Sequence, residues 1–394
     1  MTDQRKPRLL WNGDACVPTG FARVTHNVLR YLSETWDVAV IGINYRGDPH
    51  AYPYQIYPAG IGGDAWGINR LPELCQRFAP DVLMMLNDPW NLAQAFARTA
   101  FEGIPVVAYM PVDAPNLMPK FARPLDRLTC AIWQTQFGLE EARKGGHTGW
   151  SEVVYHGVDL DVYRPMEREA ARRHLRLDQH LPDGAFVVGN VNRNHLRKRL
   201  DLTIACVAEW IHRYHRDDAY LHLHCSTQDV GWDLPQLADY HGIADRLIIT
   251  DTAMSPWQGI AEEEMRAVYS GFDVQLSTTT GEGFGLTTLE GMACGVPQIV
   301  PEYAALGEWA RGAVCYVPVT STMAAVNGLN TITGIASQEA VIGALEDCYQ
   351  GESLRRALRV CGLAKVHEPQ YRWESVAQRF DEILRKVIAA SRTA

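Results

Sequence analysis

Two carboxylates and a glycine-rich loop stand close together in the stretch from residue 277 to residue 297. Glu282 and Glu290 are separated by seven residues. Glycines alternate with other residues around the first of them: Gly281, Gly283 and Gly285. A loop of this composition lacks side-chain bulk, so a ligand can approach its backbone closely. The residue types therefore favour a site at which the backbone and two carboxylates contact the same ligand.

A helix is expected to begin directly after this loop, near Leu286, and to run to Cys294. Gly295 and Pro297 then provide typical helix stop signals. The first amides of a helix have no partners within it, and together with the helix dipole they attract an anion. Glu290 would lie about one turn inside, on the ligand side. Carboxylates beside a bound phosphate indicate sugar hydroxyls; the simpler alternative is an ordinary glycine-rich turn with two solvated glutamates.

The string GEGFGLTTLEGMACGVP, residues 281–297, closely resembles the signature of family 4 retaining glycosyltransferases, which have the two-domain GT-B fold. The resemblance extends over most of the chain. It implies that Glu282 contacts the transferred sugar and that Glu290 binds the ribose of the nucleotide. It also assigns the loop backbone to the diphosphate of the donor, through Gly283, Phe284, Gly285 and Leu286.

A basic loop follows the strand expected at residues 186–191 and precedes a helix expected at 200–212. In the family, one Arg and one Lys at this place neutralise the donor diphosphate, and Arg193 and Lys198 match them. Arg suits bidentate contact with phosphate, whereas Lys supplies a point charge. Arg197 and Arg199 are expected to be solvated. The alternative for the whole loop is a solvated basic segment.

Two positions in the first half of the chain complete the expected site. Gly20 lies at the start of a helix expected at residues 21–33, after a first strand at 8–11, and matches the family's loop near the donor phosphates. Asp113 follows a strand expected at residues 106–110, in a loop held by Pro111 and Pro115. Many family members place a His near here, so we expect Asp113 to orient the donor sugar or the acceptor hydroxyl. Capping of nearby amides is the alternative role.

Apolar strands alternate with helical stretches in both halves, which predicts parallel sheets covered by helices. Besides those already named, strands are expected at 38–43, 82–86, 131–133, 153–155, 221–225, 247–250, 274–277 and 298–300. The fold class is therefore α/β, and the resemblance makes it a GT-B fold with two Rossmann-like domains facing each other across a cleft. The expected acceptor domain spans residues 1–160, with a helix at 373–394 packing back on it, and the expected donor domain spans 161–372. Residues 320–337 match the family poorly and are interpreted as an irregular insertion.

Composition limits the class of protein. The 394 residues are 47% hydrophobic and 21% charged, which is typical of soluble globular domains. Nine scattered cysteines without a CxxC pair favour reduced thiols, and no apolar run is long enough to cross a bilayer, so a cytoplasmic location is expected. The spacing of His222 and His224 can bind metal, but no third ligand is evident, so no metal ion is expected.

The resulting hypothesis is a retaining glycosyltransferase that uses a UDP- or GDP-sugar, without a metal ion, and acts on a hydroxyl of a glycan or other glycoconjugate. A dehydrogenase is disfavoured because no GxGxxG followed by an acidic residue opens either half. Two alternatives stay open: a non-catalytic sugar-nucleotide-binding protein, and a glycosyltransferase acting on a modified base in DNA. The formal charge of −9 argues against broad affinity for nucleic acid. The first half offers only scattered arginines for binding DNA, such as Arg70, Arg98, Arg123 and Arg127.

Overall fold

The computed structural model describes residues 5–98, 101, 103–250 and 259–392. The chain forms two compact units. Unit 1 comprises Met1–Gly157, Val326–Thr331 and Pro369–Ala394. Unit 2 comprises Val158–Ala325 and Ile332–Glu368. Each unit is built on its own sheet, so each has its own core.

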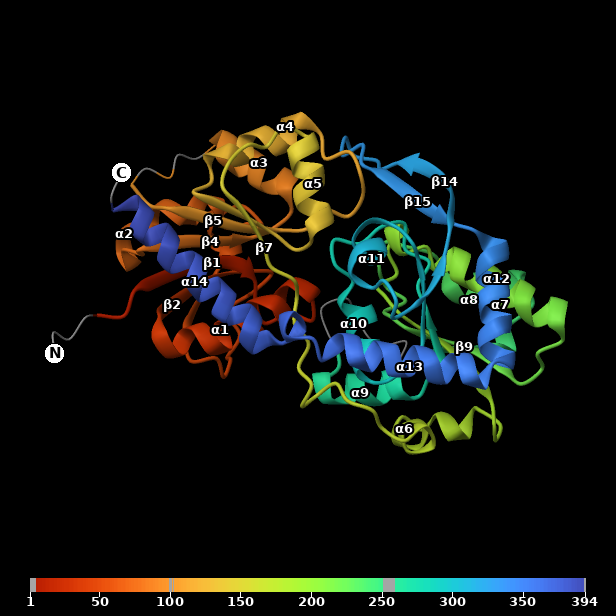
Figure 1. Ribbon diagram of the computed structural model, residues 1–394. Helices are drawn as coiled ribbons and strands as arrows, with labels where there is room; N and C mark the ends of the chain where they lie inside the picture. The colour runs from red at the N-terminus through yellow and green to blue at the C-terminus, as the bar shows by residue number, and fades with distance from the viewer. Residues whose placement is uncertain (1–4, 99–100, 102, 251–258, 393–394) are drawn as a thin grey trace. The chain divides into compact units, whose positions relative to one another are not determined.

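Unit 1 contains a seven-stranded parallel sheet in the order β3-β2-β1-β4-β5-β6-β7 (Figure 1). Its strands are β1 Arg8–Asp14, β2 Asp37–Ile43, β3 Gln55–Pro58, β4 Val82–Leu86, β5 Val106–Met110, β6 Cys130–Trp133 and β7 Ser151–Val153. The central strands are continuous apolar runs, such as VLMML in β4 and VVAYM in β5, and every residue of these two is buried. Such runs are typical of parallel strands with both faces covered.

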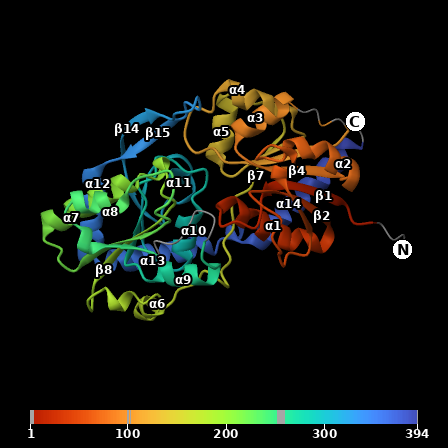
Figure 2. The same ribbon diagram turned by 180° about the vertical axis from the view of Figure 1, so that it is seen from behind.

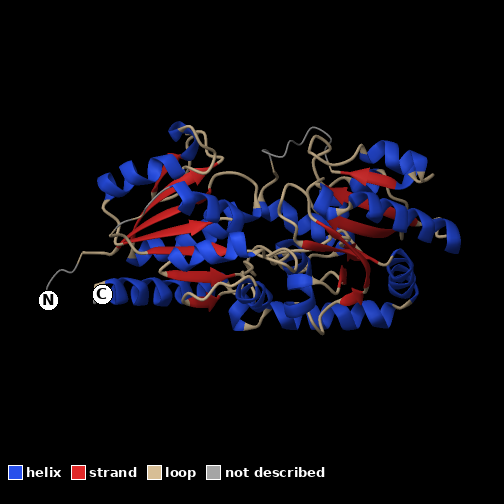
Figure 3. Cartoon of the chain, turned by 90° about the horizontal axis from the view of Figure 1, so that it is seen from above, coloured by secondary structure: helices blue, strands red, loops and turns tan. Residues whose placement is uncertain are grey.

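Helices cover both faces of this sheet (Figure 3). They are α1 Gly20–Thr35, α2 Leu71–Phe78, α3 Pro89–Arg98, α4 Pro119–Ala122, α5 Gln136–Lys144 and α14 Trp373–Ser391. Helix α14 comes from the end of the chain and packs beside α1, as Figures 1 and 2 show. Its Phe380 is fully buried. The centroid of the Phe380 ring lies 6.1 Å from that of the Trp11 ring and 5.0 Å from that of the Tyr109 ring. The last helix is therefore part of the core of unit 1.

Unit 2 contains a six-stranded parallel sheet in the order β10-β9-β8-β11-β12-β13. Its strands are β8 Phe186–Val191, β9 Ala219–His224, β10 Leu247–Ile249, β11 Val274–Leu276, β12 Gln298–Pro301 and β13 Cys315–Val317. Its helices are α6 Arg168–His174, α7 Leu200–Tyr214, α8 Leu234–Tyr240, α9 Glu262–Ser270, α10 Leu286–Ala293, α11 Ala304–Trp309, α12 Gln338–Gln350 and α13 Glu352–Val366. The predicted fold class, α/β with two Rossmann-like sheets, is confirmed.

The expected irregular insertion at residues 320–337 is wrong. Strands β14 Val319–Ala324 and β15 Ile332–Ala336 form an antiparallel pair. The turn between them contains Asn327 at φ 58° and Gly328 at φ 71°, a left-handed conformation that Asn and Gly adopt most easily. The segment is polar because most of β14 is exposed, so it lacks the buried apolar run that marks the other strands. Its Asn-Gly pair is a sequence signal for a turn.

Within the described ranges, none of the helices is both long and apolar enough to span a membrane. All nine cysteines are free thiols, and five of them are buried. Burial raises the pKa of the Cys206 and Cys225 thiols to about 12, which keeps both protonated at neutral pH.

Candidate functional site

The glycine loop ends in a conformation that requires glycine. Gly285 precedes the first turn of α10 and has φ 97° and ψ 56°, in the left-handed region. A Cβ atom at this position would lie 2.8 Å from Cδ2 of Leu306, on α11. Both the backbone dihedral and the contact exclude a side chain, so the loop meets the amino-terminal end of α10 with backbone alone.

Helix α11 holds the loop from the other side. Nε1 of Trp309 donates a hydrogen bond of 2.7 Å to the carbonyl oxygen of Phe284. The two rings stack, with centroids 4.9 Å apart and an angle of 5° between their planes. Both side chains are buried. The loop before α10 is therefore fixed by packing and by a buried hydrogen bond, which is how a preorganised anion site would be built.

Glu282 lies between two cations. Nζ of Lys198 is 2.5 Å from its Oε1, and Nη1 of Arg197 is 3.0 Å from its Oε2. The side chains of Glu282, Lys198 and Arg197 are 9%, 15% and 29% exposed, so solvent screens these contacts only in part. Burial alone would raise the pKa of Glu282, but the charges of Lys198 and Arg197 outweigh it and lower that pKa to about 2. The carboxylate is ionised at neutral pH.

Backbone contacts fix the two cations beside this loop. The amide of Thr280 donates to the carbonyl oxygen of Arg197 at 2.9 Å. The hydroxyl of Thr278 donates to the carbonyl oxygen of Arg199 at 2.7 Å and is 2.7 Å from the hydroxyl of Thr203 on α7. The segment Leu196–Lys198 and the strand end after β11 therefore lie side by side. This is why Lys198 meets a residue more than 80 positions along the chain.

The expectation that Arg197 and Arg199 are solvated is wrong. Arg197 also donates to the carbonyl oxygen of Gly281, and less than a third of its side chain is exposed. Arg199 pairs with Asp201 at 2.9 Å and is 22% exposed. Sequence alone shows only a cluster of positive charge here, and the tertiary contacts of the loop decide which carboxylate each side chain reaches. The structure thus adds Arg197 to the candidate site.

Arg193 has a different partner from Lys198. Its Nε and Nη2 atoms each donate to a carboxylate oxygen of Asp229, both at 2.9 Å. The side chain of Asp229 is only 4% exposed, whereas that of Arg193 is 59% exposed. The structure therefore brings Lys198 to Glu282 but binds Arg193 to another carboxylate.

Glu290 lies one turn into α10 and is 2% exposed. The hydroxyl of Tyr269, on α9, donates to its Oε2 at 2.5 Å. Tyr269 is itself fully buried. The two glutamates of the motif thus have different surroundings, one between cations and the other against a tyrosine hydroxyl. The assignment of Glu290 to the ribose stays a prediction.

The two expected site residues of unit 1 lie at carboxyl ends of its strands. Gly20 is the first residue of α1, whose cap is Thr19: its hydroxyl accepts from the amide of Ala22 at 3.1 Å and donates to Asp14 at 2.6 Å. Asp113 follows β5 and is half-buried. Ligands of open parallel sheets bind at this edge. Their roles also stay predictions.

The histidines of β9 are packed rather than assembled into a cluster. Nε2 of His222 is 2.6 Å from the hydroxyl of Thr250, and burial, with smaller effects of His224 and Arg172, lowers the pKa of His222 to about 3. Across the part of the chain that the structure describes, no group of three or more His, Cys, Asp or Glu residues could hold a metal ion.

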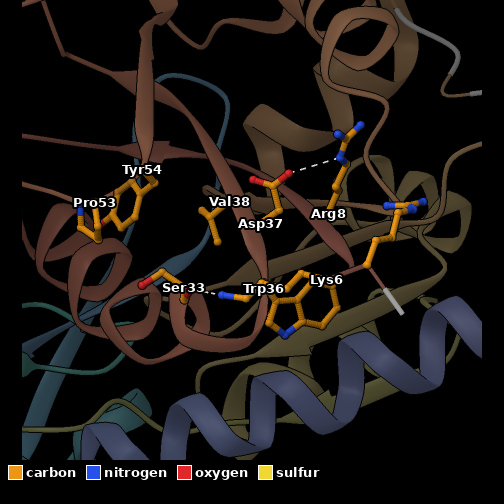
Figure 4. A pocket seen from close by; sticks show the side chains of 9 residues that line it. Lys6, Arg8, Ser33, Trp36, Asp37, Val38, Pro53 and Tyr54 are labelled. Atoms are coloured by element: carbon orange, nitrogen blue, oxygen red, sulfur yellow. Dashed lines mark hydrogen bonds and ion pairs between the residues drawn. The ribbon is translucent and has the colours of Figure 1, made fainter. Parts of the chain in front are cut away.

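A cavity of about 420 Å³ lies elsewhere in unit 1 (Figure 4). Its lining contains the first residues of β1 and β2, Arg8 and Asp37, whose side chains pair at 3.2 Å. Tyr54, just before β3, completes the same rim. This is the amino-terminal edge of the sheet, opposite to the edge at which ligands of parallel sheets bind. The cavity is therefore not part of the candidate site.

Comparison with known sequences places the residues of the candidate site that belong to unit 2 within a matched region. Residues 184–332 match the family model described as Glycosyl transferases group 1. D-inositol 3-phosphate glycosyltransferase of Rhodococcus erythropolis is 29% identical over 239 residues, which cover 60% of this chain and 48% of that protein. The protein of the same name from Rhodococcus opacus is 32% identical over 160 residues, 40% of this chain and 33% of its own length. The chain thus spans about half the length, or less, of these curated relatives.

Solved structures resemble the chain over nearly its whole length. Sucrose-phosphate synthase from Thermosynechococcus elongatus has a TM-score of 0.76 at 16% identity and covers 98% of this chain and all of its own. Anabaena Alr3699/HepE in complex with UDP-glucose has a TM-score of 0.70 at 16% identity. The match covers 96% of this chain and 99% of that protein's chain. At these identities the likeness shows the fold alone, and it confirms the predicted GT-B fold.

Proposed function

Residues 184–332 of this chain belong to the glycosyl transferases group 1 family, and on that premise we propose that the protein transfers a sugar from a nucleotide-diphosphate sugar to an acceptor hydroxyl, with retention of anomeric configuration. The observation that carries the proposal is the ionised Glu282, held by Lys198 and Arg197 directly before α10. The site joins cations, a helix amino-terminus and a carboxylate, which are the groups that a diphosphate and a sugar would need.

The diphosphate of the donor would lie against the loop before α10 and beside Lys198. As the glycosidic bond lengthens, negative charge develops on the leaving diphosphate, and a fixed cation and backbone amides stabilise that charge. Glu282 would bind hydroxyls of the transferred sugar, and Glu290 the ribose. A phosphate oxygen of the donor would accept the proton of the acceptor hydroxyl, so that no protein base is assigned.

The comparisons indicate which substrates to test first. A structurally similar protein was solved with UDP-glucose, which supports a UDP-sugar as the donor. The curated relatives are named for D-inositol 3-phosphate, which supports the hydroxyl of a sugar-like polyol phosphate as the acceptor. Asp113 is proposed to orient the donor sugar or this hydroxyl, and Gly20 to border the donor phosphates.

Calorimetric titration with UDP, GDP and ADP tests the donor site. We expect one of them to bind, and Lys198→Met to weaken that binding about tenfold or more, because a charge-assisted contact to phosphate is lost. Lys386→Met, which removes an exposed cation on α14, is the matched control and should bind as the wild type does. Failure of the wild-type protein to bind any of the three nucleotides would contradict the proposed function.

A further inference from the structure

Two of the four cations of the basic loop share one carboxylate. Lys198 lies on Oε1 of Glu282 and Arg197 on Oε2, so their charged groups converge on a single anionic group. The oxygens of a carboxylate and those of a phosphate are similarly spaced acceptors for such a pair. Glu282 thus occupies the position in which two cations would receive a phosphate.

Arg193, the residue that the resemblance assigns to the diphosphate, is engaged elsewhere. Both of its hydrogen bonds to Asp229 measure 2.9 Å, which is the bidentate geometry of a strong ion pair. The side chain of Asp229 is 4% exposed, so withdrawal of Arg193 would remove the ion-pair partner of a poorly solvated carboxylate, which would keep its hydrogen bond from the amide of Val230. Arg193 is therefore poorly placed to turn toward a phosphate.

We propose that Arg197, with Lys198, receives the donor diphosphate in this chain, and that Glu282 competes with the diphosphate for these two cations. The inference rests on the proposed donor site and deepens it. Arrival of the diphosphate breaks the ion pairs of Glu282 and leaves its oxygens available to hydroxyls of the sugar. The carboxylate therefore holds the site closed to phosphate until a complete donor, with its sugar, compensates for the broken pairs.

Competition between Glu282 and the diphosphate predicts a result that would not be expected if Glu282 only bound the sugar. UDP carries no sugar, so it gains nothing from the released carboxylate and must still displace it. Glu282→Gln keeps the shape of the side chain and removes its charge. UDP should then bind more tightly, by about tenfold, which is comparable in size to the coupling between two binding events in one protein. Transfer from a UDP-sugar should fall, because the charged sugar contact is lost.

The test compares UDP affinities by calorimetry for the wild type and five variants. We expect Glu282→Gln to bind about tenfold more tightly, Arg197→Gln to bind about tenfold more weakly, and Arg193→Gln to stay within about twofold of the wild type. Glu339→Gln is the control for loss of a carboxylate paired with Arg, since Glu339 pairs with Arg213 at 2.6 Å and its side chain is 75% exposed. It should leave the UDP affinity unchanged.

Arg197 also holds the glycine loop, so Arg197→Lys is included as a variant that keeps the charge; it should bind UDP more tightly than Arg197→Gln. Unchanged or weaker UDP binding by Glu282→Gln overturns the competition. A large loss in Arg193→Gln with none in Arg197→Gln overturns the assignment of Arg197. Either result leaves the proposed function standing as long as the wild type binds UDP, whereas absence of all nucleotide binding rejects the function itself.

Discussion

At the scale of single residues, the two glutamates of one motif are given different properties by their neighbours. Glu282 is paired with Lys198 and Arg197, and its pKa is held far below that of a free carboxyl. Glu290 accepts a hydrogen bond from Tyr269 in the interior. A carboxylate paired with two cations suits a role in which a phosphate replaces it as their partner. A carboxylate oriented by a tyrosine hydroxyl suits a fixed acceptor for hydroxyl groups.

Gly285 gives the sharpest structural prediction of the site. Gly285→Ala places a Cβ atom 2.8 Å from Leu306 and forces an alanine to φ 97°. We expect unit 2 to lose about 1–3 kcal/mol of unfolding free energy, measured by denaturant titration.

The control for that substitution is Gly343→Ala, in α12, where nothing lies within 4 Å of the added Cβ atom. This substitution should stabilise the protein by about 0.5–1 kcal/mol, since alanine suits a helix interior better than glycine. Equal effects of the two substitutions would show that the conformation of Gly285 is not the cause.

Asp113 is the residue of unit 1 whose proposed role can be separated from donor binding. Asp113→Asn keeps the shape and removes the charge, so we expect the transfer rate to fall at least about tenfold, since charge-assisted hydrogen bonds are stronger than neutral ones. The dissociation constant for UDP should stay unchanged. A variant that transfers sugar at the wild-type rate would mean that Asp113 only caps its own loop.

The candidate site could be predicted only in part from the sequence. The glycine loop, Glu282 and Lys198 lie in short motifs whose spacing is informative by itself. Arg197 lies next to Lys198 in the basic loop, but its orientation depends on hydrogen bonds to the glycine loop, from Thr280 and to the carbonyl oxygen of Gly281. Contacts between segments more than 80 residues apart leave no trace in local spacing, so the partner of each cation in a basic cluster could not be predicted.

At the scale of elements, burial decides which segments can be recognised. Strands β4, β5 and β8 have the predicted bounds because each is fully buried and either apolar throughout or begins with an apolar run. Strand β7 lies at 151–153 rather than 153–155, where the residues are only half-buried and the apolar signal is weak. The hairpin β14–β15 has a weak sequence signal for the same reason, since β14 is mostly exposed.

The packing of α14 gives a prediction at this scale. Phe380 is fully buried against the rings of Trp11 and Tyr109. Phe380→Ala should cost about 3–5 kcal/mol of unfolding free energy, through lost burial and the cavity left behind. Lys386→Ala, at an exposed position of the same helix, should change it by less than about 0.5 kcal/mol. A small effect at Phe380 would mean that α14 is not part of the core.

At the scale of the whole molecule, unit 1 is assembled from segments distant in sequence. Helix α14 packs beside α1, and Nε1 of Trp36 donates to Asp381 at 2.6 Å across 345 positions of the chain. Unit 1 therefore acquires its complete core only when the end of the chain is present. Unit 2 builds its sheet from residues between 186 and 317 alone.

Both units also bury histidines, and this makes the stability of the molecule depend on pH. Burial lowers the pKa of His156 to about 3 in unit 1 and, with smaller effects of His224 and Arg172, that of His222 to about 3 in unit 2. Burial, with a smaller effect of His50, lowers that of His26 to about 4. In the unfolded chain each histidine would bind its proton near pH 6.5. Between these pH values the unfolded state binds more protons than the folded state. The contribution of the neutral histidines to the free energy of unfolding is therefore fully present above about pH 6.5 and decreases as the pH falls.

His156 offers the cleanest test of this dependence, because it is 3% exposed and lies 2.8 Å from the hydroxyl of Tyr109. Each such histidine contributes a slope of about 1.4 kcal/mol per pH unit below its unfolded pKa. His156→Gln should be less stable than the wild type at pH 7, and its stability should fall less steeply between pH 6 and pH 5, by about that amount. Denaturant unfolding at the two pH values measures the slopes. A pH dependence of His156→Gln parallel to that of the wild type would show that His156 does not stay neutral in the folded protein.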